Sequence, residues 1–297
     1  MKILVSGASG LVGSAVVAAL ERGGNDVRKL VRGYGKVAGI RWNVETGEID
    51  QRALEEWKGP DAVIHLAGEN IGSGRWTREK KRRIRDSRVE ATKRLATSLA
   101  HAAKVRIFVG ASAIGFYGDR GEEVLTETSS KGAGFLAETC QGWESAASPL
   151  ARAGARVVHL RFGMILSGKG GALAKMLPIF RLGLGGRAGE GRQWVSWISR
   201  TDVARAIEFA LQNHDLTGPA NVVTANPVRN HEFTADLARA LHRPAVLPAP
   251  AFLLRAVFGE LADALLLSSQ CVMPEKLRQH GFQFEHPALR NALEACL

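Results

Sequence analysis

The sequence predicts an α/β fold, a doubly wound parallel sheet followed by a smaller, mostly helical C-terminal lobe. Short apolar runs rich in β-branched residues alternate with helical stretches over residues 1–165, which is typical of strands covered by helices on both faces. A glycine-rich turn joins the first strand to the first helix. Beyond residue 165 the alternation weakens, and prolines 244, 248 and 250 precede a last helical segment.

We therefore expect two parts within the 297 residues. Residues 1–165 form the sheet domain, completed by parts of 195–225, and residues 166–297 form the second lobe, including a small helical cap at about 244–297. A chain of this length buries a core of its own, and an apolar content of 45% is ordinary for a globular protein.

The individual elements follow from the period of the apolar residues. The expected strands are 2–6, 26–31, 61–66, 105–111, 156–161 and 220–223. The expected helices are 11–22, 77–102, 134–153, 172–181, 200–213 and 230–241.

The sequence shows no sign of membrane insertion, secretion or metal binding. The longest apolar stretch, 249–267, is interrupted by Arg255, Glu260 and Asp263, and a spanning helix needs about 20 apolar residues. The apolar run at 3–6 is too short for a secretory leader. The cysteines are few, far apart and without metal-ligand spacing. We expect a cytoplasmic protein with no metal and no membrane partner.

The turn after the first strand has the pattern of a dinucleotide cradle. Residues 7–13 read G-x-x-G-x-x-G, directly between a strand and a helix. Gly7 permits the tight turn, Gly10 permits close approach of a pyrophosphate, and Gly13 permits close packing of helix on sheet. The pyrophosphate would lie at the helix N-terminus. A glycine-rich turn without a ligand is the alternative, but the strand and helix around it favour binding.

The end of the second strand distinguishes NAD from NADP. An NAD site places an acidic residue there to accept a hydrogen bond from the ribose 2′-hydroxyl. This strand ends at Val31 and continues with Arg32, without a carboxylate. Since arginine pairs well with phosphate, we expect NADP(H), with Arg32 on the 2′-phosphate. The alternative is a surface arginine past the strand.

Several further motifs resemble the extended short-chain dehydrogenase/reductase family. They lie at 61–68 (DAVIHLAG), 87–92, 110–118 and 161–164. Within that family, 65–71, 185–198 and the proline-flanked C-terminal cap resemble the atypical "epimerase family" proteins, which are NAD-dependent epimerase/dehydratase-like and carry a C-terminal domain of unknown function. The cradle and the resemblance together imply cofactor contacts from Gly7, Ser9, Gly10, Leu11, Val12, Gly13, Val31, Arg32, Leu66, Ala67, Gly68, Arg88, Ala111, Ser112, Arg161, Gly163 and Met164.

The catalytic Tyr-x-x-x-Lys pair implied by this resemblance is absent. Neither of the two tyrosines, Tyr34 and Tyr117, has a lysine four residues later. If Glu144 matches the acidic residue that follows the lysine in the family, the pair is replaced by Leu136 and Cys140. Either the proton donor has moved, or the protein binds NADP(H) without turnover.

Three residues are candidates for the missing catalytic group, each with a structural alternative. Ser112 occupies the family's serine position, but a strand-end hydroxyl also bonds to backbone. Tyr117 lies nearby and could instead pack the loop. Cys140 could ionise near positive charge, although a lone helical cysteine is usually a small buried residue. His65, at a strand end, is expected to be a core histidine rather than a base.

For the substrate we expect contacts from Arg187, Arg192 and Trp194. In extended family members arginines of this region bind nucleotide-sugar pyrophosphates, and a tryptophan can stack on a ring. A polar loop anchored by its tryptophan is the alternative. The substrate is expected to be a small molecule, with a phosphate-bearing compound as one option.

Three functions remain open at this point. The first is an NADP(H)-dependent oxidoreductase or epimerase-like enzyme acting on a nucleotide sugar or another carbonyl or hydroxyl compound. The second is a non-catalytic NADP(H)-binding regulator or redox sensor. The third, nucleic-acid binding, rests on residues 75–94, with ten basic and three acidic residues. No nucleic-acid motif accompanies them, so we expect a solvated helix face, no nucleic-acid partner, and a monomer or homodimer.

Overall fold

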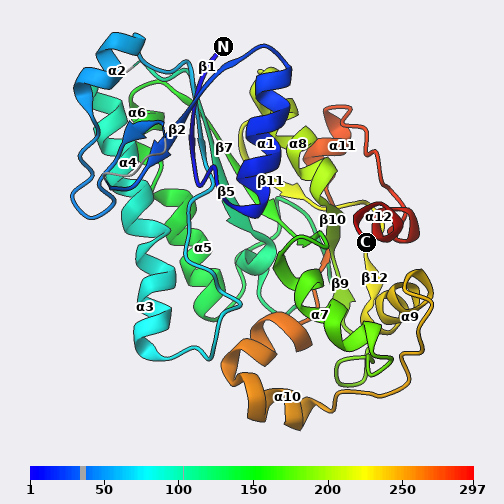
Figure 1. The fold of residues 1–297 in the computed structure, drawn as a ribbon. Helices are drawn as coiled ribbons and strands as arrows, with labels where there is room; N and C mark the ends of the chain where they lie inside the picture. Colours follow the sequence, from blue (N-terminus) through cyan, green and yellow to red (C-terminus); the bar gives the residue numbers. More distant parts are fainter. Residues whose placement is uncertain (34–37, 103) are drawn as a thin grey trace.

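A seven-stranded parallel sheet forms the centre of the computed structural model, which describes residues 1–33, 38–102 and 104–297 (Figure 1). The strand order is β11-β7-β5-β4-β1-β2-β3, so the chain winds outward in both directions from β1 and confirms the predicted sheet. Its strands are β1 (Lys2–Ser6), β2 (Asp26–Val31), β3 (Ile40–Arg41), β4 (Ala62–His65), β5 (Ile107–Ala113), β7 (Arg156–Phe162) and β11 (Gly218–Val222).

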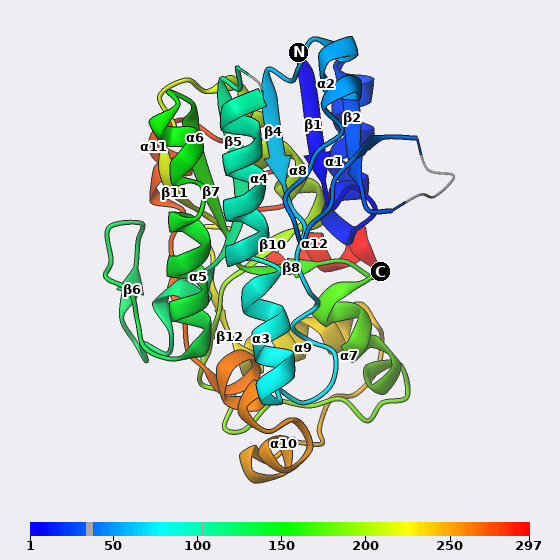
Figure 2. The same ribbon diagram turned by 90° about the vertical axis from the view of Figure 1, so that its left-hand side faces the viewer.

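Two helix layers cover the sheet because alternate residues of its strands point to opposite faces. In β1, Ile3 and Val5 pack with α1 and α8, whereas Leu4 packs with α2, α4 and α6 (Figures 1 and 2). The helices of this domain are α1 (Leu11–Arg22), α2 (Gln51–Trp57), α3 (Arg78–Asp86), α4 (Val89–Ala102), α5 (Phe135–Ser145), α6 (Ser148–Arg152) and α8 (Arg200–Gln212).

The single helix predicted at 77–102 is wrong, because the chain breaks there into α3 and α4. Ser87 and Arg88 lie between the two helices. The Ser87 hydroxyl accepts a hydrogen bond from the Glu69 amide at 3.0 Å, and Arg88 donates to the Glu69 carbonyl at 3.0 Å. The break is therefore stabilised by hydrogen bonds to a loop that is distant in sequence, which the helical pattern of 77–102 does not reveal.

The stretch 134–153 is mostly helical, as predicted, whereas short elements such as α2 and β3 were not predicted. The stretch 134–153 contains two helices, α5 and α6, with Pro149 in the first turn of α6. Proline is favoured at that position because its missing amide has no partner there in any case. The two-residue strand β3 was not predicted, since Ile40 and Arg41 are too short a run to show alternation.

The second lobe packs around its own apolar cluster, which includes Leu173, Phe180, Trp197 and Phe233. It has two small sheets, β8 with β10 in parallel and β9 with β12 antiparallel. Its elements are β8 (Met164–Leu166), α7 (Gly171–Arg181), β9 (Trp194–Val195), β10 (Trp197–Ser199), β12 (Val228–Arg229), α9 (Asn230–Ala240), α10 (Ala251–Phe258) and a π-helical turn, Ala262–Leu267.

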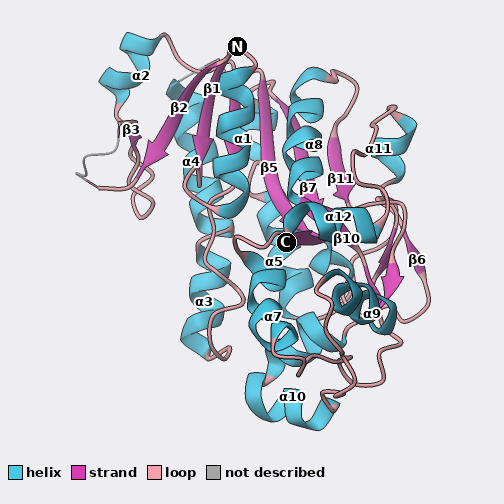
Figure 3. Cartoon of the chain, turned by 45° about the vertical axis from the view of Figure 1, so that its right-hand side comes forward, coloured by secondary structure: helices cyan, strands magenta, loops and turns pink. Residues whose placement is uncertain are grey.

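The last 27 residues run back along both parts of the molecule (Figure 3). β13 (Cys271–Val272) pairs with β6 (Val124–Leu125) of the sheet domain. α11 (Glu275–Gln279) packs beside β11 through Leu277, and α12 (Leu289–Cys296) packs against α9. No helix of the described residues is long and apolar enough to cross a bilayer.

Asp202 fastens this C-terminal stretch to α8. Its carboxylate has no solvent exposure and accepts hydrogen bonds from the Ser199 hydroxyl and from the amides of Glu285 and His286, at 2.7–3.0 Å. Ser199 is in turn the N-cap of α8 and accepts from the Asp202 amide.

Replacing this carboxylate should destabilise the fold. We expect Asp202→Ala to lower the free energy of unfolding by about 2–4 kcal/mol, because two amides and a hydroxyl lose a charged acceptor. Asp215→Ala, at an exposed position beyond the other end of α8, should change it by less than about 0.5 kcal/mol. Urea unfolding followed by circular dichroism measures both, and equal effects would contradict the role given to Asp202.

Candidate functional site

The glycine turn has the geometry of a dinucleotide cradle. Gly7 has φ +69°, and a Cβ there would lie 2.7 Å from the Ala67 amide nitrogen. A Cβ at Gly13 would lie 2.1 Å from the Gly7 carbonyl oxygen, so α1 meets the turn at backbone contact. Gly10 caps α1 without a side-chain hydrogen bond and, like Ser9, is exposed. The first amides of α1 therefore have no side-chain cap, which is what a helix N-terminus that binds a phosphate group requires.

The other expected cofactor residues lie along the same edge of the sheet. Parallel register places Ser6 beside His65, His65 beside Gly110, and Ser112 beside Arg161. The carboxyl ends of β1, β4, β5 and β7 therefore meet at one edge, where such sheets bind ligands. That edge carries Gly7, Leu66, Ala67, Gly68, Ala111, Ser112, Arg161, Gly163 and Met164.

A segment of the second lobe covers the cradle. Gly170 and Gly171 pack against the Leu11 side chain. A Cβ on either glycine would lie 3.3 Å from a Cδ atom of Leu11. Arg200 donates to the Leu11 carbonyl at 2.7 Å, and the exposed Lys169 stands next to Gly170. Sequence reasoning missed Lys169 and Arg200 as neighbours of the cradle, because they follow it by more than 150 residues.

Two arginines gather at the end of β2. Arg32 is exposed just past Val31, and Arg41 of β3 pairs in register with Val31. The sequence did not place Arg41 beside Arg32, because this follows from the pairing of β2 with β3, a strand that was not predicted.

Arg88 lies behind the cofactor edge. Its guanidinium donates to the carbonyls of Glu69 and Ile84 at 3.0 and 3.1 Å and lies 5.0 Å from the centre of a Trp143 ring. A Cβ at Gly68 would lie 3.3 Å from its Cζ. Arg88 thus holds the loop after β4 from beneath.

A buried polar network occupies the end of β5. Arg161 binds Glu144 bidentately, through Nε and Nη2 at 2.7 and 2.8 Å, and the Ser112 hydroxyl donates to the same carboxylate at 2.7 Å. Arg161 Nη1 donates to the Tyr117 hydroxyl at 3.0 Å, and that hydroxyl donates to Asn221 at 2.7 Å. The sequence analysis named Ser112, Tyr117 and Arg161 as site residues and Glu144 only through the conditional match, and it did not predict that they bond to one another.

One face of α5 runs along this network. Leu136 contacts Gly115, Cys140 lies near the Ala113 backbone, and Glu144 bonds to Ser112. Since 136, 140 and 144 are four residues apart, they share this face. Leu136 and Cys140, the residues that the conditional match places at the family's tyrosine and lysine positions, therefore lie on one side of α5 with Glu144.

Burial disfavours ionisation of two candidate catalytic groups. It raises the pKa of the Cys140 thiol to about 12, with the nearby Glu144 carboxylate adding to the effect. It also raises the pKa of the Tyr117 phenol, although Arg161 opposes that shift. Both groups are therefore neutral at physiological pH, so neither supplies a phenolate or a thiolate, and the Tyr117 hydroxyl already donates to Asn221.

His65 is a buried histidine at the end of β4. Its Nδ1 lies 2.5 Å from the Ser6 hydroxyl, and its ring packs between Trp42 and Phe108. Burial lowers its pKa to about 4, so it is neutral at physiological pH. No group of three metal-ligating side chains occurs in the described part of the chain.

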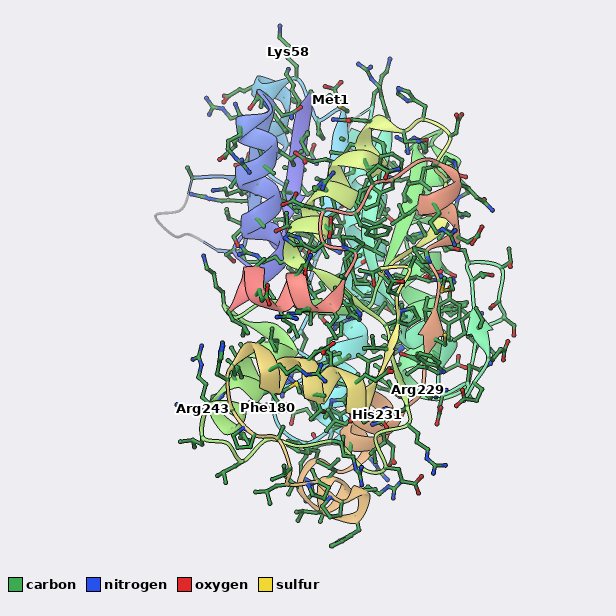
Figure 4. The ribbon with its side chains drawn as sticks, turned by 90° about the vertical axis from the view of Figure 1, so that its right-hand side faces the viewer. Met1, Lys58, Phe180, Arg229, His231 and Arg243 are labelled. Carbon is green, nitrogen blue, oxygen red and sulfur yellow. The ribbon has the colours of Figure 1, made fainter. Side chains whose placement is uncertain are left out.

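The three expected substrate residues do not form one cluster. Trp194 is covered by Arg229, whose Cζ lies 3.8 Å from the ring centre and whose guanidinium binds Glu122 (Figure 4). Arg192 is exposed, and its Nε lies 3.7 Å from Oε2 of Glu190. Arg187 and Arg192 are exposed on the loop before β9, and Arg192 lines a cavity of about 330 Å³. The remaining lining includes Asp119, Glu122, Glu190, Gln193, Arg255 and Ser269.

The sequence matches two family models, one after the other. Residues 3–225 match the NAD dependent epimerase/dehydratase family, and residues 249–296 match a domain of unknown function, DUF1731. The chain belongs to the NAD-dependent epimerase/dehydratase family. Epimerase family protein Mb2239 of Mycobacterium bovis is 43% identical over 98% of this chain and 96% of its own.

Similar relatives and structures extend beyond bacteria. The SDR39U1 homolog of Arabidopsis thaliana, named as chloroplastic, is 36% identical over 100% of this chain and 87% of its own. The crystal structure of human epimerase family protein SDR39U1 with NADPH superposes with a TM-score of 0.90 at 31% identity, over 100% of this chain and 99% of that one. The resemblance to the epimerase family is thereby confirmed.

The buried histidine makes a testable contribution to acid sensitivity. Between pH 6.5 and 4 the unfolded chain binds a proton at His65 and the folded chain does not, so acid favours unfolding. As the pH falls through this window, the free energy of unfolding of the wild-type protein should fall by about 3 kcal/mol more than that of His65→Gln. Urea unfolding at several pH values measures the difference, and parallel pH curves for the two proteins would contradict it.

Proposed function

We propose that this protein is an NADP(H)-dependent oxidoreductase of the epimerase type, acting on a carbonyl or hydroxyl group of a small molecule. The observation that carries the proposal is the Ser112 hydroxyl, held at the cofactor edge of the sheet by the Glu144–Arg161 pair. In place of a tyrosine and a lysine, this site offers one neutral hydroxyl in a fixed position.

The open α1 terminus and the backbone contacts of Gly7 and Gly13 support dinucleotide binding. Arg32 and Arg41 support NADP(H), since both lie at the end of β2 where a 2′-phosphate would be held. The human relative was solved with NADPH. When bound, the nicotinamide supplies or accepts hydride.

We assign Ser112 the role of holding the substrate oxygen. Ser112 is buried, so this role requires its hydroxyl to turn from Glu144 toward the substrate at the end of β5 while Glu144 stays paired with Arg161. The proton that a reduced carbonyl requires then comes from water. Tyr117 is a positioning residue in this scheme, because its hydroxyl already joins Arg161 to Asn221.

The second candidate function is a non-catalytic NADP(H) sensor. The observation that favours it is Leu136, an apolar side chain that packs with Phe135, Ile71 and Trp76 where the family pattern has tyrosine. Tight NADPH binding without turnover on a broad substrate panel would select this function over the first. The panel should contain nucleotide sugars, because exposed Arg187 and Arg192 would be the contacts for a phosphate-bearing substrate.

The cofactor proposal predicts a selective loss of affinity. Arg32→Ala should weaken NADPH binding about tenfold or more and NADH binding much less, because only NADPH carries the 2′-phosphate. Arg41→Ala should show a loss of the same kind. Fluorescence titration of both cofactors measures the ratio, with Arg22→Ala on the far end of α1 as the control. Equal losses for NADPH and NADH would overturn the choice of NADP(H).

The catalytic proposal predicts that turnover depends on one hydroxyl. With a substrate from the panel, Ser112→Ala should lower kcat about 100-fold or more while NADPH still binds. Cys140→Ser and Ser145→Ala, the latter on the exposed side of α5, should retain turnover. Transfer of label from deuterated NADPH to product confirms hydride transfer. Full activity of Ser112→Ala, or loss on Cys140→Ser alone, would contradict the role of Ser112.

A further inference from the structure

Helix α10 is apolar and has no buried side chain. It reads AFLLRAVF over Ala251–Phe258, and the structure buries none of these eight residues. Phe252 is 73% exposed and Val257 is 53% exposed. Proteins rarely leave a connected apolar surface in water, so such a surface marks an interaction site.

The apolar surface continues onto two neighbouring segments. Residues 182–189 and 244–251 run side by side, since the Gly189 amide donates to the Ala249 carbonyl at 2.9 Å and Gly183 packs on Pro244. We call the exposed apolar side chains of these segments and of α10 the apolar tip. Its residues are Leu182, Leu184, Val246, Leu247, Phe252, Leu253, Val257 and Phe258.

Figures 1 and 2 place α10 at the end of the molecule farthest from the N-terminus, where it projects beyond α3, α7 and α9.

Basic residues surround the apolar tip. Beside α10, Arg75 donates to the Ala256 carbonyl at 3.0 Å and Lys81 pairs with Glu260 at 2.8 Å. Residues 75–86 carry seven basic and two acidic side chains. We call the exposed arginines around the tip the basic rim. Its residues are Arg75, Arg78, Arg82 and Arg85 on the α3 side and Arg181, Arg187 and Arg243 on the α7 side. Figure 4 labels Arg243.

We propose that the apolar tip and the basic rim bind the surface of a lipid bilayer that contains anionic lipids. The apolar side chains would enter the boundary between head groups and acyl chains, while the arginines pair with lipid phosphates. We expected no membrane partner because the sequence has no apolar run long enough to span a bilayer. Binding to the surface of a bilayer does not require such a run. The proposal is independent of the proposed catalytic function.

Charge distinguishes this occupant from others. A second copy of the chain would bring two basic rims together, which is repulsive. A nucleic acid would satisfy the rim but leave the apolar tip in water. An anionic bilayer offers negative charge and an apolar layer at once.

Vesicle sedimentation with the full-length protein tests the proposal. The wild-type protein should bind vesicles of phosphatidylcholine with phosphatidylglycerol, and salt should weaken this binding. Phe252→Ser/Val257→Ser should lower the partition coefficient at least about tenfold through lost apolar contact. Arg78→Gln/Arg82→Gln should lower it about tenfold on anionic vesicles and not on phosphatidylcholine alone.

Matched controls lie far from the tip. Val124→Ser removes an exposed valine on β6, and Arg22→Gln/Arg152→Gln removes two exposed charges on α1 and α6; all should bind like wild type. Thermal melting and NADPH affinity report whether each variant is folded. If the Phe252 variant does not fold, Leu182→Ser/Val246→Ser on the neighbouring segments replaces it.

Three results would overturn the proposal. They are no binding of the wild-type protein to anionic vesicles at low salt, unchanged binding of the folded tip variants, and equal losses in the Val124 control. A wild-type dimer in sedimentation equilibrium that the tip variants convert to monomer would assign the tip to a second copy instead.

Discussion

The buried ion pair between Arg161 and Glu144 is the interaction on which the site depends. It joins β7 to α5, and through Ser112 and Tyr117 it includes β5 and the turn that follows. Because both charges lie largely out of water, neither is tolerated without the other. The pair therefore fixes the rotation of α5, and with it the face that Leu136 and Cys140 present to the end of β5.

The fold could be predicted from local sequence wherever one pattern determines one element. The glycines of 7–13 and the buried strand runs specify the turn and the parallel sheet, because each pattern reflects backbone geometry within a few residues. Breaks that depend on distant partners could not be predicted. Ser87 and Arg88 look helical in sequence, and the carbonyl and amide of Glu69 decide otherwise.

In the candidate site, too, some features could be predicted from local sequence and others could not. The cradle was predicted residue by residue, whereas the environments of Ser112, Tyr117 and Cys140 were not. Whether a hydroxyl or thiol can react depends on its burial and its partners, which come from β7, β11 and α5, far away in sequence. The exposure of α10 could not be predicted from the sequence either, since an apolar stretch of that length normally indicates burial.

The attachment of the C-terminal stretch has a consequence for how the chain can be divided. One family model ends at residue 225 and the other begins at residue 249, which suggests a module that could be removed. Yet the Asp202 carboxylate, the edge of β6 and the outer face of β11 all have partners from beyond residue 249. A chain cut at the boundary would leave a buried carboxylate without two of its three hydrogen-bond donors and a core strand open to water. The two modules of sequence are thus one cooperative unit of folding.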